Sequence, residues 1–463
     1  MRIGSYSAAL LGAVALAGCS ADRLNVPNYN SPTPEGAAAA PLVALAQASS
    51  GIITQMRGLG AGPIQQWGIL GREAYNYTAQ EGRNTTGYLV SPNDVTGFGV
   101  GTFGGYFTLQ RNAYNFDNVI DAAESALTPA QVSGARGFNN TAKGWGMLLY
   151  IMSRHDIGGP TEITDDPNFI APFVSRDSVY SWLINRLNEG QTQLAAGGTA
   201  FAFPLTAGYA GFDTPANFVK VNRAIAARAY AYRGSLSTGA TRTGFYQSAL
   251  TALGQSFLST TAALDLGAYH VYSTAAGDAT NGINNTTNLD FVAHPSIVPD
   301  AEAGDKRVAA KTRTITRKNA PVPNAISTTV GFQRYTAQTT PIPIIRNAEL
   351  ILLRAEARYF TGDQAGALAD LNVIRTGDGG LPALTAADIN TDDKFITRLL
   401  YERRYTLLIE GHRWVDVRRF GKLTTLPLDD PTHVRGVQQP VSLQECDSRK
   451  NTGNATLAAP SCP

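Results

Sequence analysis

The side chains best suited to nucleophilic or metal chemistry in this 463-residue chain are three cysteines and five histidines. No two histidines have the spacing of a metal-binding pair, and neither C-x-x-C nor G-x-S-x-G occurs. Gly421-Lys422 is followed by Leu423, where a phosphate-binding loop requires Ser or Thr. We therefore expect no catalytic activity, no metal and no cofactor, although a pair of carboxylates that only folding brings together would escape this search. The histidines are His155, His270, His294, His412 and His433.

Asp388, Asn390 and Asp392 occupy the first, third and fifth positions of a calcium-binding loop. However, Asp393 stands where that loop needs glycine, and its last position lacks the glutamate that binds calcium through both oxygens. We interpret this segment as the start of a helix, with Thr391 or Asp392 as its N-cap, because acidic residues are favoured at a helix N-terminus.

Charged and apolar side chains alternate along residues 401–422, YERRYTLLIEGHRWVDVRRFGK. One interpretation is a clamp that binds a charged ligand. The other, which we favour, is a set of ion pairs that lock this helix to its neighbours, because Arg suits partly buried carboxylates. The charged residues concerned are Glu402, Arg403, Glu410, Arg413, Asp416 and Arg418.

Aromatic residues are concentrated in the glycine-rich segment 76–107, which has six among its 32 residues, about twice the 9% of the whole chain. We expect Tyr77, Tyr88 and Phe98 to form a ligand-contacting surface with Arg83 and Asn84 as polar partners. The alternative is that these rings only fasten the loop to the helices. The remaining rings are assigned to the next helix and its core: Phe103, Tyr106 and Phe107.

Cys19 follows a short leader in which Arg2 is the only charge and residues 8–17 are apolar. This pattern predicts a secretory signal, since the apolar run is too short to span a bilayer. A buried N-terminal helix is the alternative. Leu16-Ala17-Gly18-Cys19 resembles the bacterial lipobox, which implies that a diacylglyceryl group is attached to the Cys19 thiol and that the chain is cut just before it. Residues 20–40 are rich in Asn, Pro and Ser, which predicts a flexible tether.

Cys446 and Cys462 are separated by 16 residues near the C-terminus. In an oxidising compartment they could close a small loop through a disulfide, and the alternative is two free thiols. The net charge is only +2 and no basic run stands out, so we expect no nucleic-acid partner.

The elements that must position these residues are mostly helices. In 217–233, apolar residues recur every three or four positions, which indicates one face of a helix. Helices are also expected at 42–57, 105–126, 135–154, 178–194, 245–264 and 391–412. Residues 266–345 contain many Pro, Asn and Thr, which predicts loops and short strands laid over the helices.

The clearest unit is 346–375, RNAELILLRAEARYFTGDQAGALADLNVIR. Two apolar stripes are separated by Thr361-Gly362, and Asp363 is placed to cap the second helix. A helical hairpin of this kind resembles a tetratricopeptide unit, which needs stacked neighbours to bury its apolar faces.

Segments 346–375 and 399–422 together resemble the C-terminal part of the SusD/RagB family, and LNVPNYNSPTP, YIMSRHDIGGPTEI and NFVKVNRAIAARAYAYRGS resemble other family segments. This family consists of surface-exposed nutrient-binding lipoproteins of the outer membrane. The resemblance implies a mainly α-helical fold with four tetratricopeptide-like helix pairs, a loop-rich face and few short strands. It also implies a protein without catalysis that caps a SusC-like TonB-dependent transporter and captures glycans, or peptides in some members.

The expected organisation is a signal peptide (1–18), a lipid-anchored tether (19–40) and one domain (41–463). Within the domain, a helical core (about 41–265 and 341–420) carries a loop-rich insertion (about 266–340). By family analogy, Ser20 after Cys19 favours the outer membrane. The expected function is oligosaccharide capture and transfer to the transporter. The alternatives are a peptide-binding member of the family and a helical-repeat scaffold lipoprotein.

Overall fold

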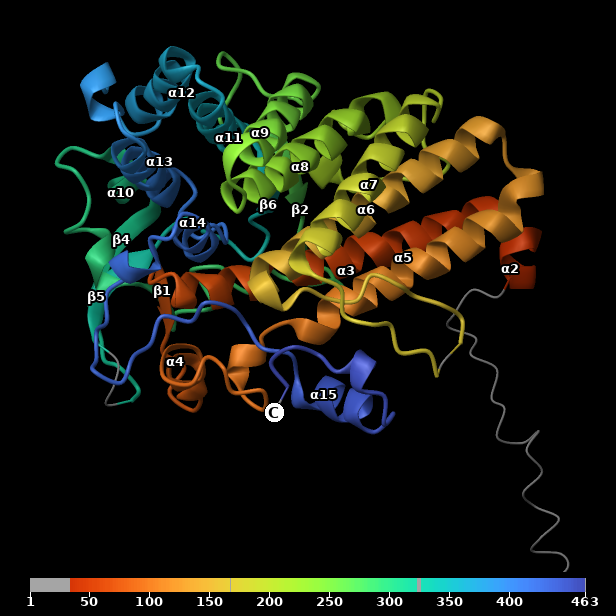
Figure 1. The fold of residues 1–463 in the computed structure, drawn as a ribbon, viewed down its shortest axis with the longest axis horizontal. Helices are drawn as coiled ribbons and strands as arrows, with labels where there is room; N and C mark the ends of the chain where they lie inside the picture. The colour runs from red at the N-terminus through yellow and green to blue at the C-terminus, as the bar shows by residue number, and fades with distance from the viewer. Residues whose placement is uncertain (1–33, 167, 323–325, 463) are drawn as a thin grey trace, which may run out of the picture.

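The computed structural model describes residues 34–166, 168–322 and 326–462, and within them the chain is mainly helical (Figure 1). Helices that follow one another pack as pairs, and neighbouring pairs also touch, so the helices form one continuous stack. This confirms the predicted helical fold. The pairs are α3 (Pro41–Leu70) with α5 (Phe103–Ala123), α6 (Pro129–Arg154) with α7 (Arg176–Ala195), α8 (Pro215–Ser235) with α9 (Gly239–Gly254), and α11 (Asn347–Phe360) with α12 (Gln364–Gly377).

Side-chain caps mark where several of these helices begin. Thr128 and Gln131 form a reciprocal capping box at the start of α6, and Thr214 caps α8. Asp363 accepts a hydrogen bond from the Gly366 amide at 2.8 Å, so the predicted cap of α12 is confirmed. These caps satisfy amides that have no partner inside the helix.

Small residues let helices α6 and α7 approach closely. A Cβ atom on Gly137 would lie 2.7 Å from Leu194 Cγ, and one on Gly144 would lie 2.6 Å from Leu187 Cγ. The predicted stripe of α8 is buried as well, from Phe218 to Tyr232. The core therefore depends on both large apolar residues and glycines at the crossings.

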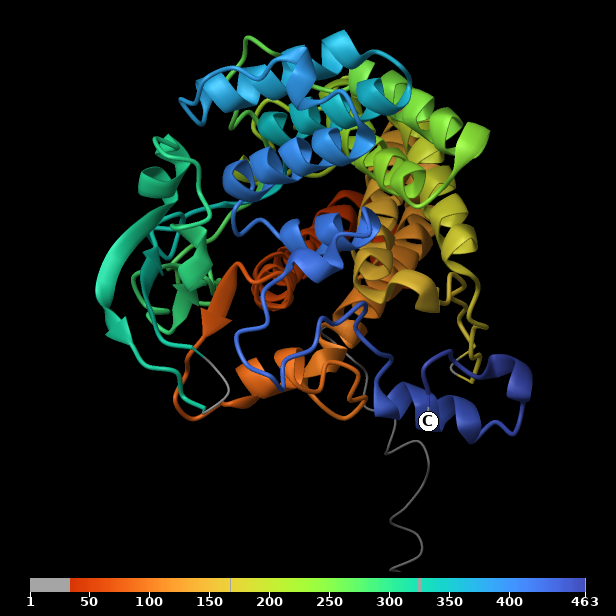
Figure 2. The same ribbon diagram turned by 60° about the vertical axis from the view of Figure 1, so that its left-hand side comes forward.

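The strands form two small sheets, and the four-stranded one lies at one end of the molecule, on the left in Figure 2. The larger, antiparallel sheet has the order β1 (Ala74–Asn76), β3 (Phe291–Ala293), β5 (Thr328–Phe332), β4 (Thr312–Lys318). The other pairs β2 (Gly267–His270) with β6 (Ile342–Arg346). The short helix α10 (Lys306–Lys311) immediately precedes β4. Short strands were expected in 266–345, and the structure places all of them except β1 there.

Several predicted boundaries differ from the structure, most of all that of α3, which was expected to end at 57 and extends to Leu70. Helix α9 ends at Gly254 rather than 264. The helix expected at 391–412 is two helices, α13 (Asp392–Thr406) and α14 (Arg413–Arg419), with Thr391 as the N-cap of the first. Within the segment expected to be a tether, 19–40, residues 34–39 form the helix α2 (Pro34–Ala39), and proline suits its first position. The signal segment 1–18 and Cys19 lie outside the described residues.

Among the described helices, none is both long enough and apolar enough to cross a bilayer.

The charged residues of α13 and α14 form buried ion pairs. Arg403 Nε donates to Asp416 at 2.7 Å, and Arg419 Nε donates to the other Asp416 oxygen at 3.0 Å. Arg419 also binds Glu356 of α11 with both of its terminal nitrogens. All four side chains are at most 2% exposed. The interpretation of this segment as a structural lock is therefore confirmed for these residues.

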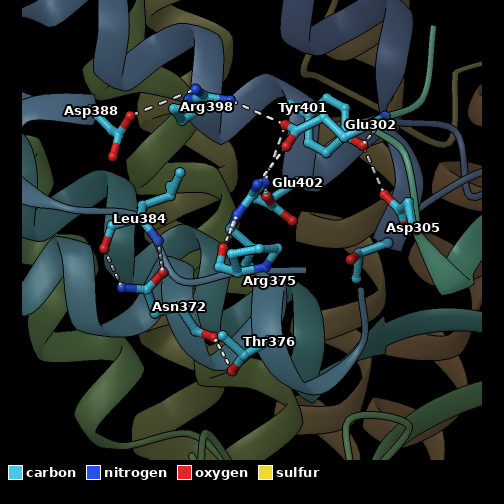
Figure 3. A network of polar contacts seen from close by, with 12 residues as sticks. Glu302, Asp305, Asn372, Arg375, Thr376, Leu384, Asp388, Arg398, Tyr401 and Glu402 are labelled. Carbon is cyan, nitrogen blue, oxygen red and sulfur yellow. Dashed lines mark hydrogen bonds and ion pairs between the residues drawn. The ribbon is translucent and has the colours of Figure 1, made fainter. Parts of the chain in front are cut away.

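A second network joins α13 to α12 and to the loop before α10 (Figure 3). Glu402 accepts hydrogen bonds from Arg375 at 3.0 Å and from Arg307 at 2.6 Å. Arg375 and Arg398 both reach Glu302, whose loop leads into the sheet. This network therefore fastens the β-rich end of the molecule to the helical stack.

Glu410, in the turn between α13 and α14, is bound by two arginines. Arg346 donates to both of its oxygens, at 2.8 and 2.9 Å, and Arg334 donates at 3.2 Å. Burial alone would raise the pKa of Glu410, but Arg346 and Arg334 outweigh burial and lower it to about 2. Glu73 is also buried but makes no ion pair among the described residues, and burial raises its pKa to about 8.

We predict that Glu410→Gln lowers the free energy of unfolding by about 3 kcal/mol at pH 7, because it leaves Arg346 and Arg334 buried without their carboxylate. The native carboxylate has the lower pKa, so its contribution is present above pH ~4.5 and is lost as the pH falls toward 2. Denaturant unfolding of both proteins between pH 3 and 8 would test this, and an equal stability at pH 7 would contradict it.

Glu73→Gln is the matched control, because it removes a buried carboxyl that is protonated at neutral pH in the folded state. At pH 4, where this carboxyl is protonated in the folded state and largely protonated in the unfolded state, we expect it to change stability by less than about 1 kcal/mol. Since its folded pKa is raised, the wild type loses stability between pH ~4.5 and ~8, and the variant should lose less over that range.

Candidate functional site

The aromatic segment leaves β1, passes through α4 (Arg83–Leu89) and continues as a loop to Gly101. It lies on the same side of the molecule as the C-terminal helix α15 (Leu443–Lys450) (Figure 1). Amide-to-carbonyl bonds join the two parts of the chain, from Leu443 to Val95 at 3.0 Å and from Val434 to Leu89 at 2.7 Å.

Tyr77 does not offer its ring to solvent. It is 2% exposed, its ring stacks on Tyr75 with centroids 5.1 Å apart, and its hydroxyl donates to the Ile326 carbonyl. The expectation of a contact surface here is wrong for Tyr77, because residues 75 and 326 cover the ring. For Tyr77 the structure agrees with the alternative interpretation, in which the ring only fastens the loop to the rest of the protein.

Tyr88 and Asn84 are also buried, at 5% and 9% exposure, because both face inward from α4. Such burial leaves little of either side chain for a ligand, and their role in ligand contact stays a prediction. Burial raises the pKa of the Tyr88 hydroxyl well above its ordinary value, so it stays protonated. Tyr88 nevertheless lines a surface hollow with one edge.

Phe98 and Arg83 remain accessible. Phe98 is half-buried and lies 6.3 Å from the Tyr88 ring, centroid to centroid. The Arg83 guanidinium lies over the Phe98 ring at 4.6 Å and is held there by Glu81, to which its Nε donates at 2.6 Å. The exposed Arg83–Glu81 pair therefore covers part of the ring.

A hollow of about 370 Å³ lies beside these two rings. None of its lining residues carries a charge, and polar amides and hydroxyls alternate with apolar groups. Such a lining suits a neutral molecule with many hydroxyl or amide groups. The lining consists of Gln66, Tyr88, Val95, Thr96, Gly97, Phe98, Val100, Gly101, Ser442, Leu443 and Gln444.

A second hollow of about 670 Å³ is lined by residues 90–94 and 434–438, together with Asp156. Val434 and Val437 are 43% and 46% exposed on its wall. Asp94, at its edge, accepts hydrogen bonds from the Thr96 hydroxyl and amide, which lower its pKa and keep it charged. The loop 90–98 contributes to both hollows, so they form one candidate surface.

The C-terminal wall of the first hollow is fastened by a disulfide. Cys446 and Cys462 are bonded at 2.06 Å, with Cα atoms 5.5 Å apart. Arg449, in the same helix, donates to the Ala171 and Leu457 carbonyls, each at 2.9 Å. These contacts hold the chain after Gln444 against the body of the protein.

The sequence search missed Gln66 and the segments 434–438 and 442–444. Gln66 lies on α3, and the other two lie more than 330 residues after Phe98's loop. The one local sign of this site is Gly101. Its φ is +62°, and a Cβ atom there would collide with Gln66 and Gln439, so glycine is needed where these distant segments meet. Within the described part of the chain, no group of three His, Cys, Asp or Glu could hold a metal ion.

We predict that the Cys446→Ser, Cys462→Ser variant is less stable than the wild type by up to about 3 kcal/mol, the chain-entropy value for a loop of this size. Mass spectrometry of unreduced, alkylated protein should find neither thiol modified in the wild type. Alkylation of both thiols would contradict the disulfide.

Residues 280–455 match the sequence profile of the SusD family. SusD-like protein P38 from Formosa agariphila is 36% identical over 90 residues, and this match spans only 18% of each of the two proteins.

Solved structures match over a much longer part of the chain. A SusD superfamily protein from Bacteroides vulgatus has a TM-score of 0.62 at 14% identity, covering 84% of this chain and 91% of that one. A laminarin-binding SusD-like protein has a TM-score of 0.59 at 16% identity, covering 87% and 97%. Residues 280–455 are therefore similar in sequence to the SusD family, and the chain shares the fold of SusD superfamily structures along most of its length.

Proposed function

We propose that this protein captures oligosaccharides at the outer surface of the outer membrane and passes them to a SusC-like TonB-dependent transporter. The observation that carries the proposal is the uncharged hollow beside Tyr88 and Phe98, in a chain whose residues 280–455 match the SusD family. The laminarin-binding relative by fold supports a glycan as the ligand. The proposed role is binding without catalysis.

The chemistry of the hollow fits a neutral glycan. Sugar rings present C–H groups that pack on an aromatic face, while amides and hydroxyls bind their hydroxyl groups. Phe98 supplies the aromatic face, and Gln66, Thr96 and Gln444 supply polar groups around it. Few contacts of this kind give affinities on the order of micromolar to millimolar, which allow the ligand to be released.

A peptide ligand is the second candidate, and the second hollow favours it. Val90, Pro92, Val434 and Val437 line this hollow with aliphatic groups, two of them widely exposed. Such groups suit an apolar peptide side chain better than a sugar. A scaffold role without any small ligand is the remaining alternative.

We predict that Phe98→Ala weakens binding of a neutral oligosaccharide found on a glycan and peptide array about tenfold, about 1.4 kcal/mol, because the stacking face is lost. Titration calorimetry on the purified protein would measure this. Full affinity in a folded Phe98→Ala variant would place the site elsewhere.

Arg83→Ala and Tyr77→Phe serve as matched variants. Removing Arg83 uncovers the Phe98 ring, so affinity should stay equal or rise. Tyr77→Phe removes only a buried hydrogen bond to Ile326, so it should change stability and leave affinity unchanged. A loss with Arg83→Ala as large as with Phe98→Ala would show that Arg83 itself contacts the ligand.

The proposed membrane attachment is through lipid on Cys19. We predict that Cys19→Ala moves the protein from the membrane to the soluble fraction, since the acyl chains supply about 0.8 kcal/mol per buried CH2 group. Cell fractionation with immunoblotting would measure this. A Cys19→Ala variant that remains in the membrane fraction would disprove the anchor.

A further inference from the structure

A cavity of about 40 Å³ lies between the helices and shares no lining residue with the two hollows of the candidate surface. Its walls come from α3, α6, α8, α11, the β2–β6 sheet and the turn between α13 and α14. Several polar groups face one another across it, including His270, Glu349 and His412.

Two prolines remove backbone donors from the walls. Pro63 lies inside α3 and has no N–H to donate to the carbonyl of Leu59, and both residues line the cavity. Pro343 lies in β6 opposite Tyr269, at an irregular place in the β2–β6 register. Buried carbonyls that lose a backbone donor need another one.

The hydrogen bonds of His412 fix which of its ring nitrogens carries the proton. Arg403 donates to the Tyr232 hydroxyl at 3.0 Å, and the same nitrogen lies 3.5 Å from His412 Nδ1. A guanidinium only donates, so Nδ1 is an acceptor and receives the Tyr232 hydroxyl proton at 3.1 Å. Burial lowers the pKa of His412 to about 4, so the ring is neutral and Nε2 carries the remaining proton. Nε2 lies 3.7 Å from Glu349, too far for a direct hydrogen bond.

His270 and Trp145 add two further polar groups. His270 is 4% exposed and contacts the Trp145 ring edge to face at 5.5 Å, and its imidazole makes no hydrogen bond with any described side chain or carbonyl. The Trp145 Nε1–H donor also has no protein partner in the described part of the chain. A buried polar group without a partner costs about 1–3 kcal/mol, so these groups favour a ligand that both donates and accepts.

We infer that this cavity is a binding site for about three water molecules that bridge His412 Nε2 to Glu349 and bind His270. Each water molecule needs ~10–15 Å³ of cavity volume, so a cavity of about 40 Å³ holds about three. The charges around the cavity are already matched, Glu349 by Arg228 at 2.6 Å and Glu410 by Arg346 at 2.8 Å. A neutral ligand therefore fits better than an ion.

A high-resolution crystal structure of the purified protein tests the inference. Density peaks are expected about 3 Å from both His412 Nε2 and Glu349. In solution, oxygen-17 relaxation dispersion of water should detect the same long-lived molecules. A cavity without such peaks, or with one strong peak that neutral water cannot explain, would overturn it.

Xenon provides the control, because it occupies dry apolar cavities and not hydrated polar ones. Crystals of the wild type under xenon pressure should show none at this position. His270→Leu removes one of the polar groups and leaves Glu349 and His412 in place, so the variant should lose at least one long-lived water and keep the bridging one. Xenon in the wild-type cavity would contradict the proposed hydration, whether or not the variant folds.

Discussion

The burial of charge in the C-terminal part is the constraint on which the rest of the structure depends. Charged residues make up only 16% of the chain, yet Arg403, Asp416, Arg419 and Glu356 are almost completely buried. Leaving one of them unpaired would cost several kcal/mol. Helix α13 must therefore present Arg403 to α14 while α14 presents Arg419 to α11, which leaves one arrangement for the three helices.

The same constraint reaches the candidate surface through α14. Trp414 Nε1 donates to the Gly436 carbonyl at 2.7 Å, and Arg418 donates to the Val437 carbonyl at 2.9 Å. Both bonds hold the main chain of the segment that lines the second hollow, without using its side chains. The position of this wall is thus set by the buried core, and its chemical character by Val434 and Val437, whose side chains stay free for contact.

Helices could be predicted wherever the pattern is local, as in the hairpin of α11 and α12, whose stripes and cap all lie within 30 residues. The end of α13 could not, because it depends on distant groups. Lys311 donates to the Tyr405 and Thr406 carbonyls, and Arg346 donates to Thr406, so the last carbonyls of α13 are bound from outside. The chain then turns through Gly411, where φ is +82°, and only after this turn does α14 begin.

The candidate site shows the same division between local and distant information. The excess of aromatic residues was visible in the sequence, but whether a ring is covered depends on its partners. Tyr77 is covered by a segment 249 residues later, whereas no distant segment covers Phe98 to the same extent. The local pattern of residue types does not reveal which distant segments will pack against a ring. The sequence could therefore identify the aromatic loop, but it could not show which of its rings stays accessible.

The shape of the first hollow and its chemical character depend on different parts of the chain, and this affects how a ligand preference can arise. The walls of the first hollow meet through main-chain bonds, such as Leu443 to Val95, which any side chain at these positions would permit. Its shape is therefore a property of the fold, whereas its chemistry depends on a few side chains such as Gln66, Phe98 and Gln444. Proteins with this fold can then differ in ligand without any change in the buried ion pairs, so the fold alone does not determine what is bound.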